Sequence, residues 1–184
     1  MILPIYVYGH PVLRKIAQDI DKDYEGLEKL LKDMWQTMYE TDGVGLAAPQ
    51  IGKSIRLFVI DADPFQDIDP KAEGFKRTFI NAEITERGGE AWVMNEGCLS
   101  IPLIHEDVKR EETIHIKYYD ENWELHEEDF NGHLARVIQH EYDHLEGKMF
   151  IDHISGLKKR LLKGKLAQIS KGKSRCGYRV VAPK

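Results

Sequence analysis

The sequence predicts a single globular domain, residues 1–184, that combines helices with short strands. With 184 residues, of which 42% are hydrophobic and 31% charged, the chain is long enough to bury a core. Two segments repeat apolar side chains at helical spacing, and several runs of β-branched and aromatic residues end at turn-forming residues. No apolar run approaches the length of a membrane span, and the first residues lack a signal-peptide core. We therefore expect a cytoplasmic protein that does not enter a membrane.

The first predicted helix covers residues 24–39. Its apolar side chains recur three and four positions apart, as on a helix with one buried face: Leu27, Leu30, Leu31, Met34 and Met38. The next stretch, residues 41–50, contains two glycines and a proline. We expect it to be irregular, with a backbone that can approach a ligand closely.

Strands are predicted from residue 55 onward. Residues 55–60 are mostly β-branched and aromatic, which indicates a strand buried on both faces. Residues 61–76 contain two prolines, a glycine and five acidic side chains, and are expected to form a surface loop. Two hairpins are predicted farther along: residues 78–85 with 90–94, and residues 113–119 with 123–130.

The second predicted helix, residues 133–146, carries the pattern His140-Glu141-Tyr142-Asp143-His144. Asn131 is placed to cap its start, and Gly147 to end it. Residues four apart on a helix share a face, so the two imidazoles can bind one metal ion while Glu141 reaches a ligand on that ion. Two histidines leave the ion half coordinated, because a catalytic site normally takes a third protein ligand and keeps a position for water.

The third ligand is not evident downstream, where no histidine follows at the spacing of metzincin proteases. Upstream, Cys98 stands in Glu96-Gly97-Cys98-Leu99-Ser100, at the end of a predicted strand. Cys98 and Cys176 are too few for a disulfide framework, so each is expected to be a free thiol or a metal ligand.

The charge is unevenly distributed along the chain. Residues 157–184 carry ten Lys or Arg and no acid, whereas residues 1–156 carry 16 basic and 31 acidic side chains, a net charge of −15. Leucines in residues 157–169 permit another helix, weakened by Gly164. A basic segment on an acidic body suggests an anionic partner, such as ribosomal RNA or a membrane surface. The alternative is a solvated segment that keeps the protein soluble.

Three motifs together resemble the peptide deformylase family, enzymes of bacteria and organelles that remove the formyl group from the initiator methionine of nascent chains. They appear here in the expected order as GVGLAAPQ (43–50), EGCLS (96–100) and QHEYDHLEG (139–147). The early segment HPVLRKIA also looks like the family, so the resemblance covers roughly residues 1–155. It implies an α+β fold in which short, mostly antiparallel sheets surround the central metal helix. The core would be residues 1–156, with residues 157–184 as a basic extension.

The resemblance implies that Cys98, His140 and His144 bind one divalent metal ion and that Glu141 is the general base and then the acid. A thiolate with two neutral imidazoles leaves one positive charge on the ion, enough to acidify a bound water. The family's oxyanion donors are the backbone N–H of Leu99 and the side-chain amide of Gln50. Fe²⁺ is the expected ion in the cell, and Zn²⁺, Ni²⁺ or Co²⁺ suit the same ligands.

Substrate contacts are implied in the same way. Gly45 would let the substrate backbone pair with the enzyme as an added strand. Val44 and Val137, with His133 at the rim, would enclose the methionine side chain, although the two valines could equally serve only the core.

Three further residues follow from the family pattern. Glu96 would orient a metal ligand and pair with Arg110, the alternative being a simple surface ion pair. His105 stands where much of the family has a substrate-facing arginine. A weaker or pH-dependent grip on the distal peptide backbone is therefore expected, because histidine changes charge near neutral pH.

Two other functions fit parts of this sequence. A zincin-type metallopeptidase shares the helix motif, but it needs a third ligand downstream and would keep its metal after Cys98→Ala. A catalytically inactive, metal-stabilised binding module would close the fourth coordination position. The intact Glu141 and Gln50 argue against it, because such a module needs neither a base nor an oxyanion donor.

Overall fold

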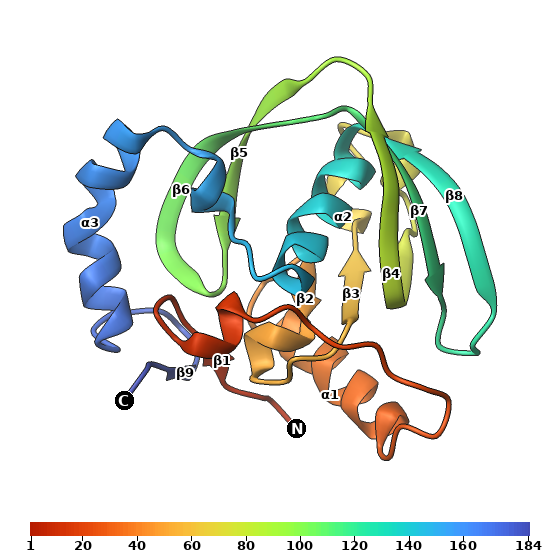
Figure 1. Cartoon of the computed structure of the whole chain (residues 1–184), viewed down its shortest axis with the longest axis horizontal. Coiled ribbons are helices and arrows are strands. Elements are labelled where there is room, and N and C mark those ends of the chain that lie inside the picture. Colours follow the sequence, from red (N-terminus) through yellow and green to blue (C-terminus); the bar gives the residue numbers. More distant parts are fainter.

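The computed structural model describes all 184 residues as an α+β fold (Figure 1). Its helices are α1 (Leu27–Glu40), α2 (Gly132–Leu145) and α3 (Gly156–Ser170). Its strands, in chain order, are β1 (Ile5–Tyr6), β2 (Gly45–Ala47), β3 (Leu57–Asp61), β4 (Lys76–Gly88), β5 (Trp92–Cys98), β6 (Ile101–Arg110), β7 (Thr113–Tyr119), β8 (Leu125–Asn131) and β9 (Val180–Val181). Short 3-10 turns, including Ala48–Ile51, fill several of the connections.

The strands form three separate sheets. The largest has the order β2-β3-β4-β7-β8 and is antiparallel throughout, with β2 at one edge. β5 and β6 form an antiparallel pair of their own, and β1 pairs in parallel with β9. The expected arrangement of short, mostly antiparallel sheets is confirmed.

Helix α2 lies between the five-stranded sheet and the β5–β6 pair (Figure 1). One face packs its apolar side chains against the sheet, in a buried cluster that includes Leu134, Ile138 and Leu145 from α2 with Phe58 and Phe79 from the sheet. Burying a side chain of this size contributes about 1.5–3 kcal/mol. The opposite face of α2 is directed toward β5 and β6, and it carries His140 and His144.

The predicted hairpin between residues 78–85 and 90–94 is wrong. β4 pairs with β3 and β7, while β5 pairs only with β6. Gly88 still lies opposite Thr113 of β7, but four residues later Trp92 lies opposite Arg110 of β6. The chain thus leaves the large sheet through Gly89, whose φ is +74°. Gly88 and Gly89 indicated a tight turn, but β4 and β5 belong to different sheets, so no hairpin forms between them.

Most of the other predicted elements are confirmed. The hairpin β7–β8, the strand near residue 57 and the helices α1 and α3 are confirmed, with boundaries shifted by a few residues. Residues 41–50 are less irregular than expected, because β2 and a 3-10 turn lie within them. The long strand β6 was not predicted, since Pro102 and its several charged residues obscure the alternation.

The ends of α2 follow the predicted positions. Asn131 precedes the first turn, but its side chain makes no capping bond and accepts instead from Lys71 Nζ at 3.0 Å. Gly147 has φ +68°, and a Cβ there would lie 2.6 Å from the Arg14 carbonyl oxygen. Glycine is therefore required both by the backbone conformation and by the close approach of residues near the N-terminus.

The basic segment is folded onto the rest of the chain. Leu162, Leu166 and Ile169 of α3 are buried in a cluster that also contains Ile104 and Val108 of β6. Beyond α3 the chain returns to pair β9 with β1, so both termini lie at the same side of the molecule (Figure 1). The lysines of the basic segment, residues 157–184, remain largely exposed.

None of the three helices combines the length and the apolar character that crossing a bilayer requires.

Candidate metal centre

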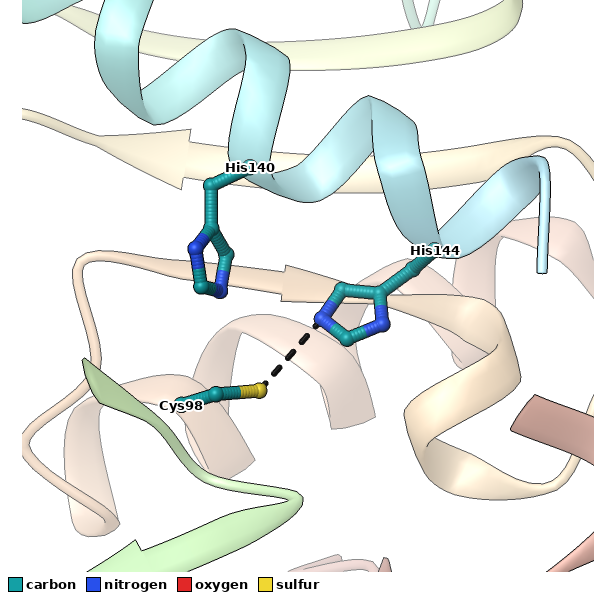
Figure 2. A group of neighbouring side chains, drawn as sticks. All are labelled: Cys98, His140 and His144. Carbon is teal, nitrogen blue, oxygen red and sulfur yellow. Dashed lines mark hydrogen bonds between the residues drawn. The ribbon is translucent and has the colours of Figure 1, made fainter. Parts of the chain in front are cut away.

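Three potential metal ligands converge from two elements. Cys98 ends β5, while His140 and His144 project from successive turns of α2 toward it (Figure 2). One ligand atom from each residue lies within 4.8 Å of those of the other two, and Cys98 Sγ is 3.4 Å from His144 Nε2. One ion can contact all three, because metal bonds to sulfur and imidazole nitrogen are about 2.0–2.3 Å long. The donor set suits a first-row transition metal.

The Cys98 thiol ionises readily in this setting. Burial alone would raise its pKa, but the charge of His144 and the hydrogen bonds with His140 and His144 outweigh burial and lower the pKa to about 5. The amide nitrogen of Gln50 also approaches the sulfur, at 3.4 Å. The thiolate is the form that binds a metal, so the neighbours of Cys98 favour the reactive form.

Glu96 orients the first histidine. Its Oε1 is 2.8 Å from His140 Nδ1, which leaves the other ring nitrogen as the ligand atom. Burial by itself would raise the pKa of Glu96, but the hydrogen bonds from His140 and Arg110 hold that pKa well below its ordinary value. An ionised acceptor on Nδ1 sets the tautomer and the ring orientation that a metal ligand needs.

Two buried arginines neutralise Glu96. Arg110 binds it bidentately, with Nε to Oε2 at 2.8 Å and Nη2 to Oε1 at 3.0 Å, and Arg136 Nη1 donates to Oε2 at 2.8 Å. Glu96, Arg110 and Arg136 are each at least 94% buried. The pairing of Glu96 with Arg110 is therefore internal and not a surface ion pair. Arg110 also donates to Asp143, which contacts His153 at 2.7 Å.

Glu141 is buried against Gly45. A Cβ at position 45 would lie 2.5 Å from Glu141 Oε1, so only glycine leaves room for the carboxyl group. Burial raises the pKa of Glu141, and its Oε2 has no hydrogen-bond partner. A carboxyl group with a raised pKa and a free oxygen is suited to accept a proton and return it.

The amide of Gln50 is held in one orientation. Its Oε1 accepts a hydrogen bond from the Ala47 backbone at 2.9 Å, so Nε2 is turned toward Cys98 and toward Ser100 Oγ, which is 3.3 Å away. The neighbouring Leu99 carbonyl accepts a hydrogen bond from the Tyr178 hydroxyl at 2.8 Å. Gln50 lies beside the sulfur through its Nε2, and Leu99 does so as the residue that follows Cys98.

A cavity of about 450 Å³ opens over these groups. Its lining includes Val44, Gly45, Val137 and His105, as the resemblance implied. His133 is not itself among the lining residues. Its ring stacks on Phe65, which does line the cavity, at 5.8 Å between centroids, and packs against Trp92 at 5.3 Å. His133 therefore lies beside the cavity, in contact with one of its lining residues.

Sequence comparison agrees with this geometry: the family model described as polypeptide deformylase matches residues 2–160. The chain belongs to the polypeptide deformylase family. A peptide deformylase of Christiangramia forsetii is 55% identical, with 100% of this chain and 97% of that protein covered. One from Flavobacterium psychrophilum is 54% identical, with 98% and 96% covered.

Solved deformylase structures share the fold. The peptide deformylase from Thermotoga maritima matches with a TM-score of 0.76 and 44% identity, covering 84% of this chain and 99% of its own. That from Legionella pneumophila matches with a TM-score of 0.81 and 37% identity, covering 95% and 99%. The deformylase family is metal-dependent, and membership in it does not favour the zincin-type alternative.

Some residues of this deformylase site were not predicted from the sequence. Arg136 lines the cavity and lies four residues before His140, so it shares a helix face with that ligand, and this spacing was the available signal. Arg175, Cys176 and Tyr178 also line the cavity, although they lie far along the chain in the basic segment. No pattern in the sequence marks them.

Proposed function

We propose that this chain hydrolyses the N-formyl group of N-formyl-methionyl peptides, releasing formate and a free N-terminal amine. The observation that carries the proposal is the convergence of Cys98, His140 and His144 within 4.8 Å, with Glu141 and Gln50 beside them. These five residues come from the three motifs shared with the family. The direct test is formate release from a formyl-methionyl peptide by anaerobically purified protein, with the metal content measured in parallel.

Cys98, His140 and His144 would hold one divalent ion, which when bound supplies a positive charge that acidifies water and polarises the formyl oxygen. We favour Fe²⁺ in the cell, with Zn²⁺, Ni²⁺ or Co²⁺ as ions the same donors accept. The ionised Cys98 and the fixed tautomer of His140 support this ligand set.

Glu141 acts as base and then as acid. Its carboxylate accepts one proton from the attacking water as the new C–O bond forms at the formyl carbon, and it returns that proton to the amine nitrogen as the C–N bond breaks. The free Oε2 and the position beside Gly45 support this role, because the carboxyl group is confined at the edge of the cavity.

Gln50 and the Leu99 backbone N–H stabilise the oxygen that becomes negatively charged in the tetrahedral intermediate. Gln50 is suited to this because its Oε1 is already bonded to the Ala47 N–H, so only its N–H groups face the cavity. A preorganised donor of this kind is worth about 10²–10³ in kcat.

The substrate peptide binds along β2. This strand is the edge of the five-stranded sheet, so its outer side can accept a further strand at Gly45. Val44 and Val137, which both line the cavity, contact the methionine side chain. His133 supports the rim of this pocket from outside, through its stack on the lining residue Phe65.

His105 contacts the distal part of the peptide. Its ring covers Gly97, where a Cβ would lie 2.5 Å from the imidazole, and its side chain is exposed at the cavity rim. The expected result of His105→Ala is a higher KM for a formylated tripeptide with little change in kcat, because the imidazole no longer contacts the distal peptide backbone. Equal KM values for the variant and the parent protein would remove His105 from substrate binding.

Replacing Cys98 with alanine is expected to abolish metal binding and activity together. Two imidazoles alone leave the ion with too few protein ligands for a catalytic site. Metal analysis and formate release after anaerobic purification measure both effects. Cys176→Ala is the control for metal content, because Cys176 lines the cavity but is not one of the three ligands. A Cys98→Ala protein that retained a full complement of metal would support a zincin-type site instead.

We further propose a cytoplasmic location and a contact between the exposed lysines of α3 and the ribosome, where the substrate emerges. Because Leu162 and Leu166 hold α3 in the core, deleting the segment would damage the fold, and charge reversal is the cleaner test. Lys159→Glu with Lys163→Glu, both exposed, is expected to reduce cosedimentation with ribosomes at low salt. Equal cosedimentation of the variant and the parent protein would refute the contact.

A further inference from the structure

Residues 173–179, here called the C-terminal arch, span the gap between α3 and β9. The arch is held at both ends. On the α3 side, Lys173 N donates to the Gln168 carbonyl at 3.0 Å, and on the β9 side, Ile5 N donates to the Arg179 carbonyl at 2.9 Å. The arch lies beyond residue 160, where the match to the deformylase family model ends. Its course therefore lies outside the part of the fold that the family model describes.

The arch reaches the catalytic cavity. Four of its residues, Arg175 to Tyr178, line the same cavity as Cys98 and Glu141. The half-buried Tyr178 anchors it there, because its hydroxyl donates to the Leu99 carbonyl at 2.8 Å, one residue from Cys98. The arch thus forms one side of the cavity.

Arg175 is the one cation of the arch that lines the cavity. Its side chain is exposed and takes part in no hydrogen bond or ion pair within the chain. The other arginine of the cavity, Arg136, is buried and already bonded to Glu96. Among the exposed lining residues, the other ionisable side chains are Asp42 and His105.

We propose that Arg175 is a specificity-determining residue that contacts the substrate peptide beyond its methionine and favours acidic side chains there. This inference rests on the proposed deformylase function. The peptide must extend out of the cavity past its rim, and an unpaired guanidinium at that rim attracts a carboxylate and repels an ammonium group. Tyr178 contributes by holding the arch, and therefore Arg175, against Leu99.

The test compares amidated peptides of sequence formyl-Met-Xaa-Ala and formyl-Met-Ala-Xaa, with Glu, Gln or Lys at Xaa. In one of the two series the parent protein should show a kcat/KM for Glu that exceeds that for Lys by about two- to fivefold at low salt, the range of an exposed ion pair. The preference should fade at about 0.5 M salt. Arg175→Glu should reverse it, because the rim then loses its guanidinium and gains a second carboxylate besides that of Asp42, and Tyr178→Phe should move the Glu/Lys ratio toward one.

Lys173→Ala is the matched control, since Lys173 is an exposed cation of the same arch that does not line the cavity. It should leave the ratio unchanged. Binding of the deformylated product peptides, followed by fluorescence anisotropy, gives the same Glu/Lys ratio without turnover. Equal ratios in the parent protein and in Arg175→Glu would overturn the inference, whereas absence of formate release from the metal-loaded parent protein would overturn the proposed function.

Discussion

Replacing Glu141 with glutamine is expected to lower kcat for formate release by about 10²–10⁴-fold, the usual contribution of a positioned acid–base group. Glutamine has nearly the same shape, so the close packing against Gly45 is kept, but it cannot accept the proton of water. Glu141 does not belong to the ligand set, and the metal content should therefore stay at the parent level. Steady-state kinetics with metal analysis of the same preparation measures both quantities.

The matched control is Glu146→Gln at the end of α2. Glu146 pairs with Arg56 at 2.7 Å and does not line the cavity, so its loss should affect stability slightly and kcat little. If Glu141→Gln kept kcat within a few-fold of the parent protein while metal content was unchanged, another group would have to supply the base.

Replacing Glu96 with glutamine is expected to lower the free energy of unfolding by about 3–5 kcal/mol, because the change removes the carboxylate that neutralises buried Arg136 and Arg110. Arg110 keeps Asp143, but Arg136 has no other acidic partner. The amide also weakens the hydrogen bond to His140, and metal affinity should fall about 10–100-fold. Urea unfolding and competition with a chelator measure the two effects separately.

The control for Glu96 is its register partner across the strands, Glu106, which pairs with Lys158 at 2.9 Å near the surface. Glu106→Gln should cost no more than about 1 kcal/mol. A loss for Glu96→Gln no larger than this would show that the buried network adds little stability.

Acid titration gives an independent check on Glu96. Because its folded-state pKa lies below the unfolded value, the carboxylate stabilises the fold above the ordinary glutamate pKa of about 4.3, and this stabilisation is lost as the pH falls below that value. The Glu96→Gln protein lacks that titration. Its stability should therefore fall less steeply with acid than that of the parent protein.

The family membership and the helices could be predicted from the sequence because their signals are local. The His140–His144 spacing specifies one helix face, and the apolar repeat of α1 specifies another, without reference to distant residues. The motif around Cys98 placed the thiol at a strand end, and β5 does end there.

Local signals in the sequence were insufficient to predict contacts between separate elements, such as which strands pair with each other. The glycines at 88 and 89 indicated a hairpin, yet β4 and β5 belong to different sheets. The stripe on α2 placed His133 at the rim of the pocket, but it did not predict that its ring would stack on Phe65, which lines the cavity, and pack against Trp92. In both cases the deciding contacts come from residues that are distant in the sequence.

By itself the sequence determined the motif residues, the helix that carries two of the histidines and the family to which the chain belongs. Only the tertiary structure decided how the third potential ligand, the Glu96 network and the C-terminal arch meet at one cavity. The physical reason is that spacing along a helix is set by the local backbone, whereas Arg136 meeting Glu96, or Tyr178 meeting Leu99, depends on how separate elements pack. The arch is the clearest case, because its 79-residue separation from Leu99 leaves no local signal to follow.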